Sequence, residues 1–145
     1  MKLAIQNLRQ AAQTGRKKLS RYVLRWRMRG QPEAEILVAE RKLRGLEQYN
    51  KLRNADIVLV SFGKSGRTWL RVMISHLFRV MHSLPDNAIL GFDNFHNMNP
   101  QVPKIFFTHD NYIKDYTGDA SSKKPFYDKP VILLARDPRD VAVSQ

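Results

Sequence analysis

The 145-residue sequence contains no cysteine. Disulfide cross-links, thiolate metal sites and a cysteine nucleophile are therefore excluded. No apolar run approaches the roughly 18 residues that a membrane-spanning helix needs, and residues 1–10 lack the apolar core of a signal peptide. These absences favour a cytoplasmic location. The composition, 43% hydrophobic and 10% aromatic, is that of a globular protein with one sizeable core.

Acidic residues are scarce, and their distribution is uneven. The chain carries 25 Lys and Arg against 13 Asp and Glu, a net charge of +12. Residues 1–54 hold 14 basic and 4 acidic residues (net +10), and residues 55–145 hold 11 and 9 (net +2). We therefore predict two regions: a basic helical N-terminal extension over residues 1–54, and a nearly neutral domain over residues 55–145.

The extension contains a helix with one apolar face. Leu19, Tyr22, Val23 and Trp26 recur at i, i+3, i+4 and i+7 among many Lys and Arg residues. Such a helix can lie on an anionic membrane surface or bind a polyanion. Alternatively, the apolar face packs on the rest of the protein and the cations are solvated. A second helix is expected to follow the Gly-Gln-Pro interruption at residues 30–32.

A phosphate-binding turn is predicted between an apolar strand at residues 55–62 and a helix at residues 68–82. The stretch from Ser61 reads SFGKSGRTWL, with two glycines, a lysine, an arginine and three hydroxyl side chains. Glycine lets backbone N–H groups approach an anion, and a helix N-terminus adds partial positive charge. An ordinary turn with solvated charges is the alternative. The helix that follows has an apolar stripe, with polar residues on the opposite side, formed by Leu70, Met73, Ile74, Leu77, Phe78 and Met81.

Two further apolar segments, residues 104–108 and 130–135, are each followed by a side chain that can take part in catalysis or bind an anion. His109 follows the first and Arg136 the second. Parallel strands bind ligands beyond their carboxyl ends, so Lys64, His109 and Arg136 should share one rim. The turn-rich stretch at residues 83–102 could line an acceptor pocket.

Three motifs resemble the sulfotransferase family that uses 3′-phosphoadenosine 5′-phosphosulfate (PAPS). Residues 63–69, GKSGRTW, resemble the phosphosulfate-binding loop PKSGTTW, with Gly63 and Arg67 in place of a proline and a threonine. It does not fit the nucleotide-triphosphatase pattern GxxxxGK[ST]. Residues 107–109 look like the strand end KTH, with Phe107 in place of the lysine. Residues 135–145, ARDPRDVAVSQ, resemble the 3′-phosphate motif RNPKDVAVS.

This resemblance implies an α/β fold: a P-loop-like parallel sheet with flanking helices in three α/β/α layers. It also implies sulfuryl transfer from PAPS to a hydroxyl or amine, with no metal. His109 would be the general base and Lys64 would stabilise the bridging oxygen. The implied donor-binding residues are Lys64, Ser65, Gly66, Arg67, Thr68, Trp69, Arg136 and Ser144.

The chain is expected to be an N-terminal fragment of such a domain, incomplete at its C-terminus. The helix after Asp137 would be very short, and the third strand would lack the crossover that covers its second face. Two rival functions stay open: a nucleotide kinase of similar fold, or a basic polyanion- or membrane-binding module. Carbohydrate, lipid and small-molecule acceptors all fit the sequence. No nucleic-acid partner is expected, and peripheral membrane contact would use the basic N-terminus.

Overall fold

The computed structural model describes residues 2–143. They form two compact units, one made of residues 2–49 and 111–121 and the other of residues 50–110 and 122–143. Residues 111–121 thus group with the N-terminal helices. The predicted domain boundary at residue 54 stays a prediction. Within residues 2–143, no helix is both long enough and apolar enough to cross a membrane.

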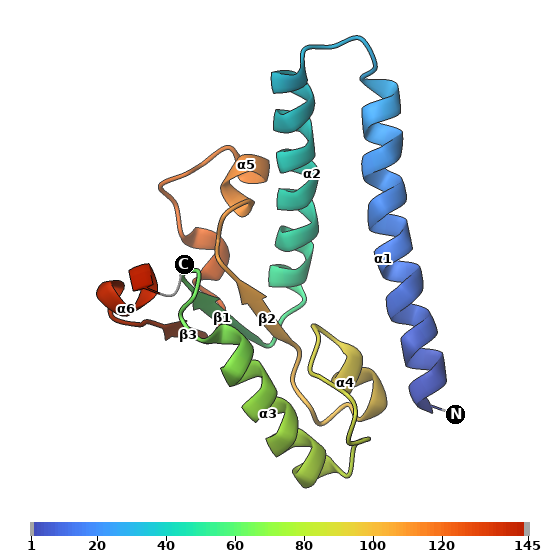
Figure 1. Ribbon diagram of the computed structural model, residues 1–145, viewed down its shortest axis with the longest axis vertical. Helices are drawn as coiled ribbons and strands as arrows, with labels where there is room; N and C mark the ends of the chain where they lie inside the picture. The colour runs from blue at the N-terminus through green and yellow to red at the C-terminus, as the bar shows by residue number, and fades with distance from the viewer. Residues whose placement is uncertain (1, 144–145) are drawn as a thin grey trace. The chain divides into compact units, whose positions relative to one another are not determined.

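The first unit is built on two antiparallel helices, α1 (Lys2–Arg27) and α2 (Glu33–Arg53) (Figure 1). The chain reverses at Gly30, whose φ of +97° suits glycine. Arg25 Nε lies 2.5 Å from Glu40 Oε1 and Arg21 pairs with Glu47 at 3.7 Å. The hydrogen bond from Arg25 lowers the pKa of Glu40 below its ordinary value. Helix α1 therefore turns its ion-pairing side toward α2.

The short helix α5 (Ile113–Thr117) completes this unit by packing on α2. Arg44 and Arg41 each place a guanidinium 5.5 Å from the centre of the Tyr112 ring, and the Tyr49 and Tyr116 rings are 5.4 Å apart. Cation–π contacts of this kind are directional. They fix α5 along one side of α2, where Gly45 is buried.

The second unit contains a three-stranded parallel sheet in the order β2-β1-β3. Strands β1 (Ile57–Ser61), β2 (Ile105–Thr108) and β3 (Val131–Leu134) correspond to the three apolar segments of the sequence. The helices α3 (Arg67–His82), α4 (Asn94–Met98) and α6 (Pro138–Val143) and the 3₁₀ turn η1 (Lys124–Phe126) belong to the same unit. The predicted α/β class, a parallel sheet with flanking helices, is confirmed.

The core lies around β1 and β2, whereas most side chains of β3 are exposed to solvent. Val58 and Leu59 point to opposite faces of the sheet and are both almost fully buried. Phe95 and Val102 from the connection before β2 are buried with them. On β3, by contrast, Leu133 is 73% exposed. This matches the expectation of a third strand without cover.

The orientation of α3 differs from what its apolar stripe suggested. Met73, Leu77 and Met81 are each more than half exposed, while Ser75 is buried. Ser75 Oγ donates to Arg71 O at 2.6 Å and accepts the Leu90 N–H at 2.9 Å. The polar side of the helix faces inward because it supplies the hydrogen bonds that hold the residue 84–91 segment.

The packing of α5 on α2 leaves no room for a side chain at position 45. A Cβ there would lie 2.8 Å from Tyr116 Cβ and 3.0 Å from Tyr116 N. Gly45→Ala should therefore lower the free energy of unfolding by about 1–3 kcal/mol, as overpacking typically does. Gly15→Ala is the matched control, because a Cβ at that position would meet nothing within 4 Å. It should raise stability by up to about 1 kcal/mol through helix propensity. Denaturant unfolding of both variants measures the difference, and equal effects would contradict this packing.

Candidate anion-binding site

The turn between β1 and α3 has two residues in left-handed backbone conformation. Lys64 has φ +61° and Gly66, at the N-cap position of α3, has φ +86°. A positive φ is unfavourable for a lysine by about 1–2 kcal/mol. Such local strain persists only where the surrounding structure fixes it, and it is concentrated at binding sites and turns. The turn is thus bent tightly at the N-terminus of a 16-residue helix.

The centre of this turn holds a buried hydroxyl without a partner. Ser65 is only 6% exposed, and its Oγ has no hydrogen-bond partner within residues 2–143. Ser61 Oγ, at the end of β1, is in the same state. A buried, unsatisfied polar atom costs about 1–3 kcal/mol. An oxyanion at the turn would supply the missing acceptor, so the residues present fit a phosphate or phosphosulfate ligand.

Cations on the first two turns of α3 favour the same kind of ligand. Burial lowers the pKa of the Arg67 guanidinium, and the nearby charge of Arg71 lowers it further. Arg71 lies over the Phe107 ring at 5.2 Å, and its Nε is buried without a hydrogen-bond partner among the described residues. Two crowded guanidinium groups, one of them with an unsatisfied buried Nε, attract an anion. Thr68 and Trp69 are exposed, the latter by 76%.

Arg136 joins the end of β3 to the turn. Its guanidinium donates from Nη1 to the Lys64 carbonyl oxygen at 3.2 Å, and its Nε lies 4.0 Å from Asp140 Oδ2. Two residues 72 positions apart in the sequence are therefore in direct contact. Lys64 itself is exposed, so its ammonium group is accessible to a ligand. Ser144, the other predicted 3′-phosphate residue, lies outside the described residues.

His109, directly after β2, is hydrogen-bonded to the last residue of β1. Its Nδ1 lies 2.6 Å from the Ser61 carbonyl oxygen. A carbonyl oxygen only accepts hydrogen bonds, so in the neutral imidazole Nδ1 carries the proton. Nε2 then carries the lone pair, and the ring is oriented by a backbone group. This is the tautomer and the restraint that a general base requires.

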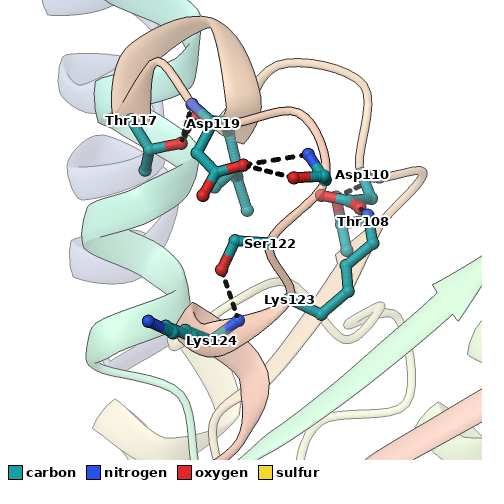
Figure 2. A network of polar contacts seen from close by, with 9 residues as sticks. Thr108, Asp110, Thr117, Asp119, Ser122, Lys123 and Lys124 are labelled. Atoms are coloured by element: carbon teal, nitrogen blue, oxygen red, sulfur yellow. Dashed lines mark hydrogen bonds and ion pairs between the residues drawn. The ribbon is translucent and has the colours of Figure 1, made fainter.

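Asp110 and Lys123 form an ion pair next to His109 that sequence reasoning missed. The Lys123 ammonium contacts Asp110 Oδ2, and Asp110 N donates to Thr108 Oγ1 at 2.9 Å (Figure 2). Asp110 also has a positive φ, +55°. Its carboxylate is thus held by a partner cation at the sharp turn after β2. No motif pointed to Lys123, because it lies in a segment without periodicity.

A cavity of about 550 Å³ opens beside the turn. Ser65 and Arg136 supply its polar lining, and the rest is apolar. The apolar part comes from the turn, β3 and the start of α6, through Phe62, Leu133, Leu134, Ala135, Pro138, Val141 and Ala142. A pocket with an apolar wall and a few polar groups is typical of small-ligand sites. Phe62, which lines it, was not singled out from the sequence.

Together these features define an α/β protein with a candidate anion-binding turn, a restrained histidine and an arginine at the carboxyl edge of its sheet. Comparison with known proteins gives the family. Residues 54–145 match the family model described as "Sulfotransferase domain". The chain therefore belongs to the sulfotransferase domain family.

One curated relative supports this assignment. Cytosolic sulfotransferase 13 of Arabidopsis thaliana is 30% identical over 113 residues, which cover 68% of this chain and 33% of that protein. The chain thus spans about a third of the length of the curated relative it matches. No solved structure matches the chain significantly.

The structure therefore brings Lys64, His109 and Arg136 to one edge of the sheet, as the parallel-strand rule predicted. Ser65 lies with Arg136 in the lining of the same cavity. The roles assigned to them stay predictions.

The unsatisfied hydroxyl gives a test of the site that needs no ligand. Ser65→Ala should leave the free energy of unfolding unchanged or raise it by up to about 1 kcal/mol, because it removes a buried group without a partner. Ser75→Ala is the matched control. Ser75 is buried and satisfied, so its loss leaves the Leu90 N–H unpaired and should cost about 1–3 kcal/mol. Denaturant unfolding compares the two. A loss at Ser65 as large as that at Ser75 would mean that Ser65 Oγ is already paired.

Proposed function

We propose that this chain forms the donor-binding part of a sulfotransferase that moves a sulfuryl group from PAPS to a hydroxyl or amine acceptor. The observation that carries the proposal is the buried, unpartnered Ser65 hydroxyl at the N-terminus of α3, beside the Arg136 guanidinium. Family membership supports transfer chemistry in general. The donor and the residue roles are our proposal.

The donor's anionic groups would be held at two places. Backbone N–H groups of the turn, Ser65, Arg67 and Thr68 would bind the 5′-phosphosulfate at the positive end of the α3 dipole. Arg136 and Ser144 would bind the 3′-phosphate, as the resemblance to the RNPKDVAVS motif implies. Trp69, which is exposed next to the turn, would stack on the adenine ring.

The donor supplies an activated sulfuryl group on a phosphate leaving group. Lys64 would stabilise the negative charge that develops on the bridging oxygen as this bond breaks. His109 Nε2 would take the proton from the acceptor hydroxyl or amine. Its orientation is supported by the Nδ1 bond to the Ser61 carbonyl. No metal is required, because side chains and the helix dipole provide the positive charge.

The acceptor stays open between carbohydrate, lipid and small-molecule classes. The apolar cavity next to Ser65 and Arg136 fits the nucleoside part of the donor better than a charged acceptor, because its wall is almost entirely aliphatic and aromatic. A cytoplasmic location is part of the same proposal.

Calorimetric titration separates this proposal from a nucleotide kinase. Adenosine 3′,5′-bisphosphate, the desulfated donor, should bind, and ATP with Mg²⁺ should bind much more weakly. Preference for ATP would favour the kinase.

Lys64 gives the first test of the proposed mechanism. Lys64→Ala should lower the rate of sulfuryl transfer about a hundredfold or more, since loss of one such charge-stabilising group costs on the order of 3–4 kcal/mol of barrier. Its folding should be unaffected, because the side chain is exposed. Lys42→Ala, which removes an exposed lysine from α2, is the control and should keep full activity. Near-normal turnover of the Lys64 variant would contradict its role.

His109 gives the second test, in which transfer and donor binding should respond differently. His109→Ala should abolish transfer while the affinity for adenosine 3′,5′-bisphosphate changes by no more than a few-fold, because a base acts on the acceptor and not on the donor. Asp110→Asn is the neighbouring control. Its carboxylate is bound to Lys123, so it should retain transfer activity. If His109→Ala stays active and Asp110→Asn does not, the base is Asp110.

A further inference from the structure

Helix α1 exposes an apolar face that its own unit does not cover. Leu8, Leu19, Tyr22, Val23 and Trp26 are between 40% and 71% exposed. At about 100° per residue they fall on one stripe of the helix. Large apolar side chains gathered on one exposed stripe mark an interaction surface. We call these five residues the α1 apolar face.

The residues that border this face are cationic. Arg16 and Arg27 lie on one side of it and Lys18 on the other, each within about 100° of Leu19 around the helix. All three are exposed, as is Arg29 just beyond the helix end. None of residues 1–32 is acidic, whereas nine are Lys or Arg.

The acidic partners of α1 all lie on the opposite side. Glu33, Glu40 and Glu47 are on α2 and pair with Arg25 and Arg21. The hairpin thus pairs Arg21 and Arg25 with acidic residues of α2. The cations that border the α1 apolar face have no ion pair among the described residues. The helix keeps its apolar stripe and its unpaired positive charge on the same outward side.

We infer that the α1 apolar face binds the surface of an anionic lipid bilayer, with α1 lying in the plane of the interface. Aliphatic side chains and the Tyr22 and Trp26 rings would enter the headgroup boundary, where aromatic residues are favoured. Arg16, Lys18, Arg27 and Arg29 would contact anionic headgroups, each basic residue strengthening binding roughly fivefold. This inference is independent of the proposed transfer activity.

Charge and polarity argue against the other occupants of this face. A second copy of α1 would bring the bordering cations together with no acidic residue on either helix to offset them. A nucleic acid would engage the cations and could stack on the two aromatic rings, but it offers nothing apolar to cover Leu8, Leu19 and Val23. A lipid surface with anionic headgroups matches both parts of the pattern.

Vesicle binding by the whole chain tests the inference. Vesicles of phosphatidylcholine containing roughly a third phosphatidylserine should bind the protein at least about tenfold more tightly than pure phosphatidylcholine vesicles. Raising the salt from about 0.1 M to about 1 M should weaken binding, as the screening length falls from about 10 Å to about 3 Å. Trp26 fluorescence, recorded in a Trp69→Phe background because the chain has two tryptophans, should shift to the blue on binding.

Paired variants assign the binding to this face. Tyr22→Ser with Trp26→Ser should weaken co-sedimentation with anionic vesicles at least about tenfold, since binding scales with the apolar area buried. Leu37→Ser with Val38→Ser, which changes two similarly exposed residues of α2, should have little effect. Lys18→Gln with Arg27→Gln should weaken binding about 25-fold, and Lys42→Gln with Lys114→Gln, on α2 and α5, much less.

Three results would overturn the inference. The first is binding that is equal for neutral and anionic vesicles, or that survives loss of Tyr22 and Trp26. The second is tight, salt-dependent binding to heparin or single-stranded RNA without binding to vesicles, which would make the surface a polyanion site. The third is a Trp26 blue shift that depends on protein concentration without lipid, which would mean that copies of the chain cover the face. Far-UV circular dichroism of each variant checks that the helices are intact.

Discussion

Two backbone carbonyl groups at the carboxyl end of β1 hold the candidate site together. The Ser61 carbonyl accepts a hydrogen bond from His109, and the Lys64 carbonyl accepts one from Arg136. Because β1 is the central strand, each neighbouring strand delivers its functional side chain to the same short segment. A backbone carbonyl has fewer degrees of freedom than a side chain, so these acceptors orient a histidine and an arginine more rigidly than side-chain partners would. The geometry of the site therefore depends on the parallel register of three strands.

Much of this arrangement could be predicted from the sequence because it depends on local patterns. Continuous apolar runs predicted the three strands, and the glycines and hydroxyl residues after the first predicted the phosphate-binding turn. The parallel-strand rule then predicted that Lys64, His109 and Arg136 would meet at one edge. It could not predict which atoms would be in contact. The tautomer of His109 and the unsatisfied Ser65 hydroxyl are properties of packing and appear only in three dimensions.

The features that the sequence did not predict depend on contacts between distant segments. Helix α5 is too short for its periodicity to be recognised, and it is held by aromatic and cation–π contacts with α2. The orientation of α3 could not be predicted from the sequence, because periodicity identifies an apolar face but not the surroundings of that face. Here Ser75 is the buried residue, since the chain after α3 needs its hydroxyl as a hydrogen-bond acceptor. A polar face can be the inner one when it satisfies backbone groups.

Helices α1 and α3 both expose apolar stripes, but only α3 lies within the residues that match the family. Helix α3 starts at the candidate anion-binding turn and lies within the residues that match the sulfotransferase family. Helix α1 ends before residue 54, where that match begins, and its stripe is bordered by unpaired cations. Its apolar face can therefore change without altering the turn, His109 or Arg136. The proposed membrane attachment and the proposed transfer chemistry would thus use separate residues, and a change in one need not alter the other.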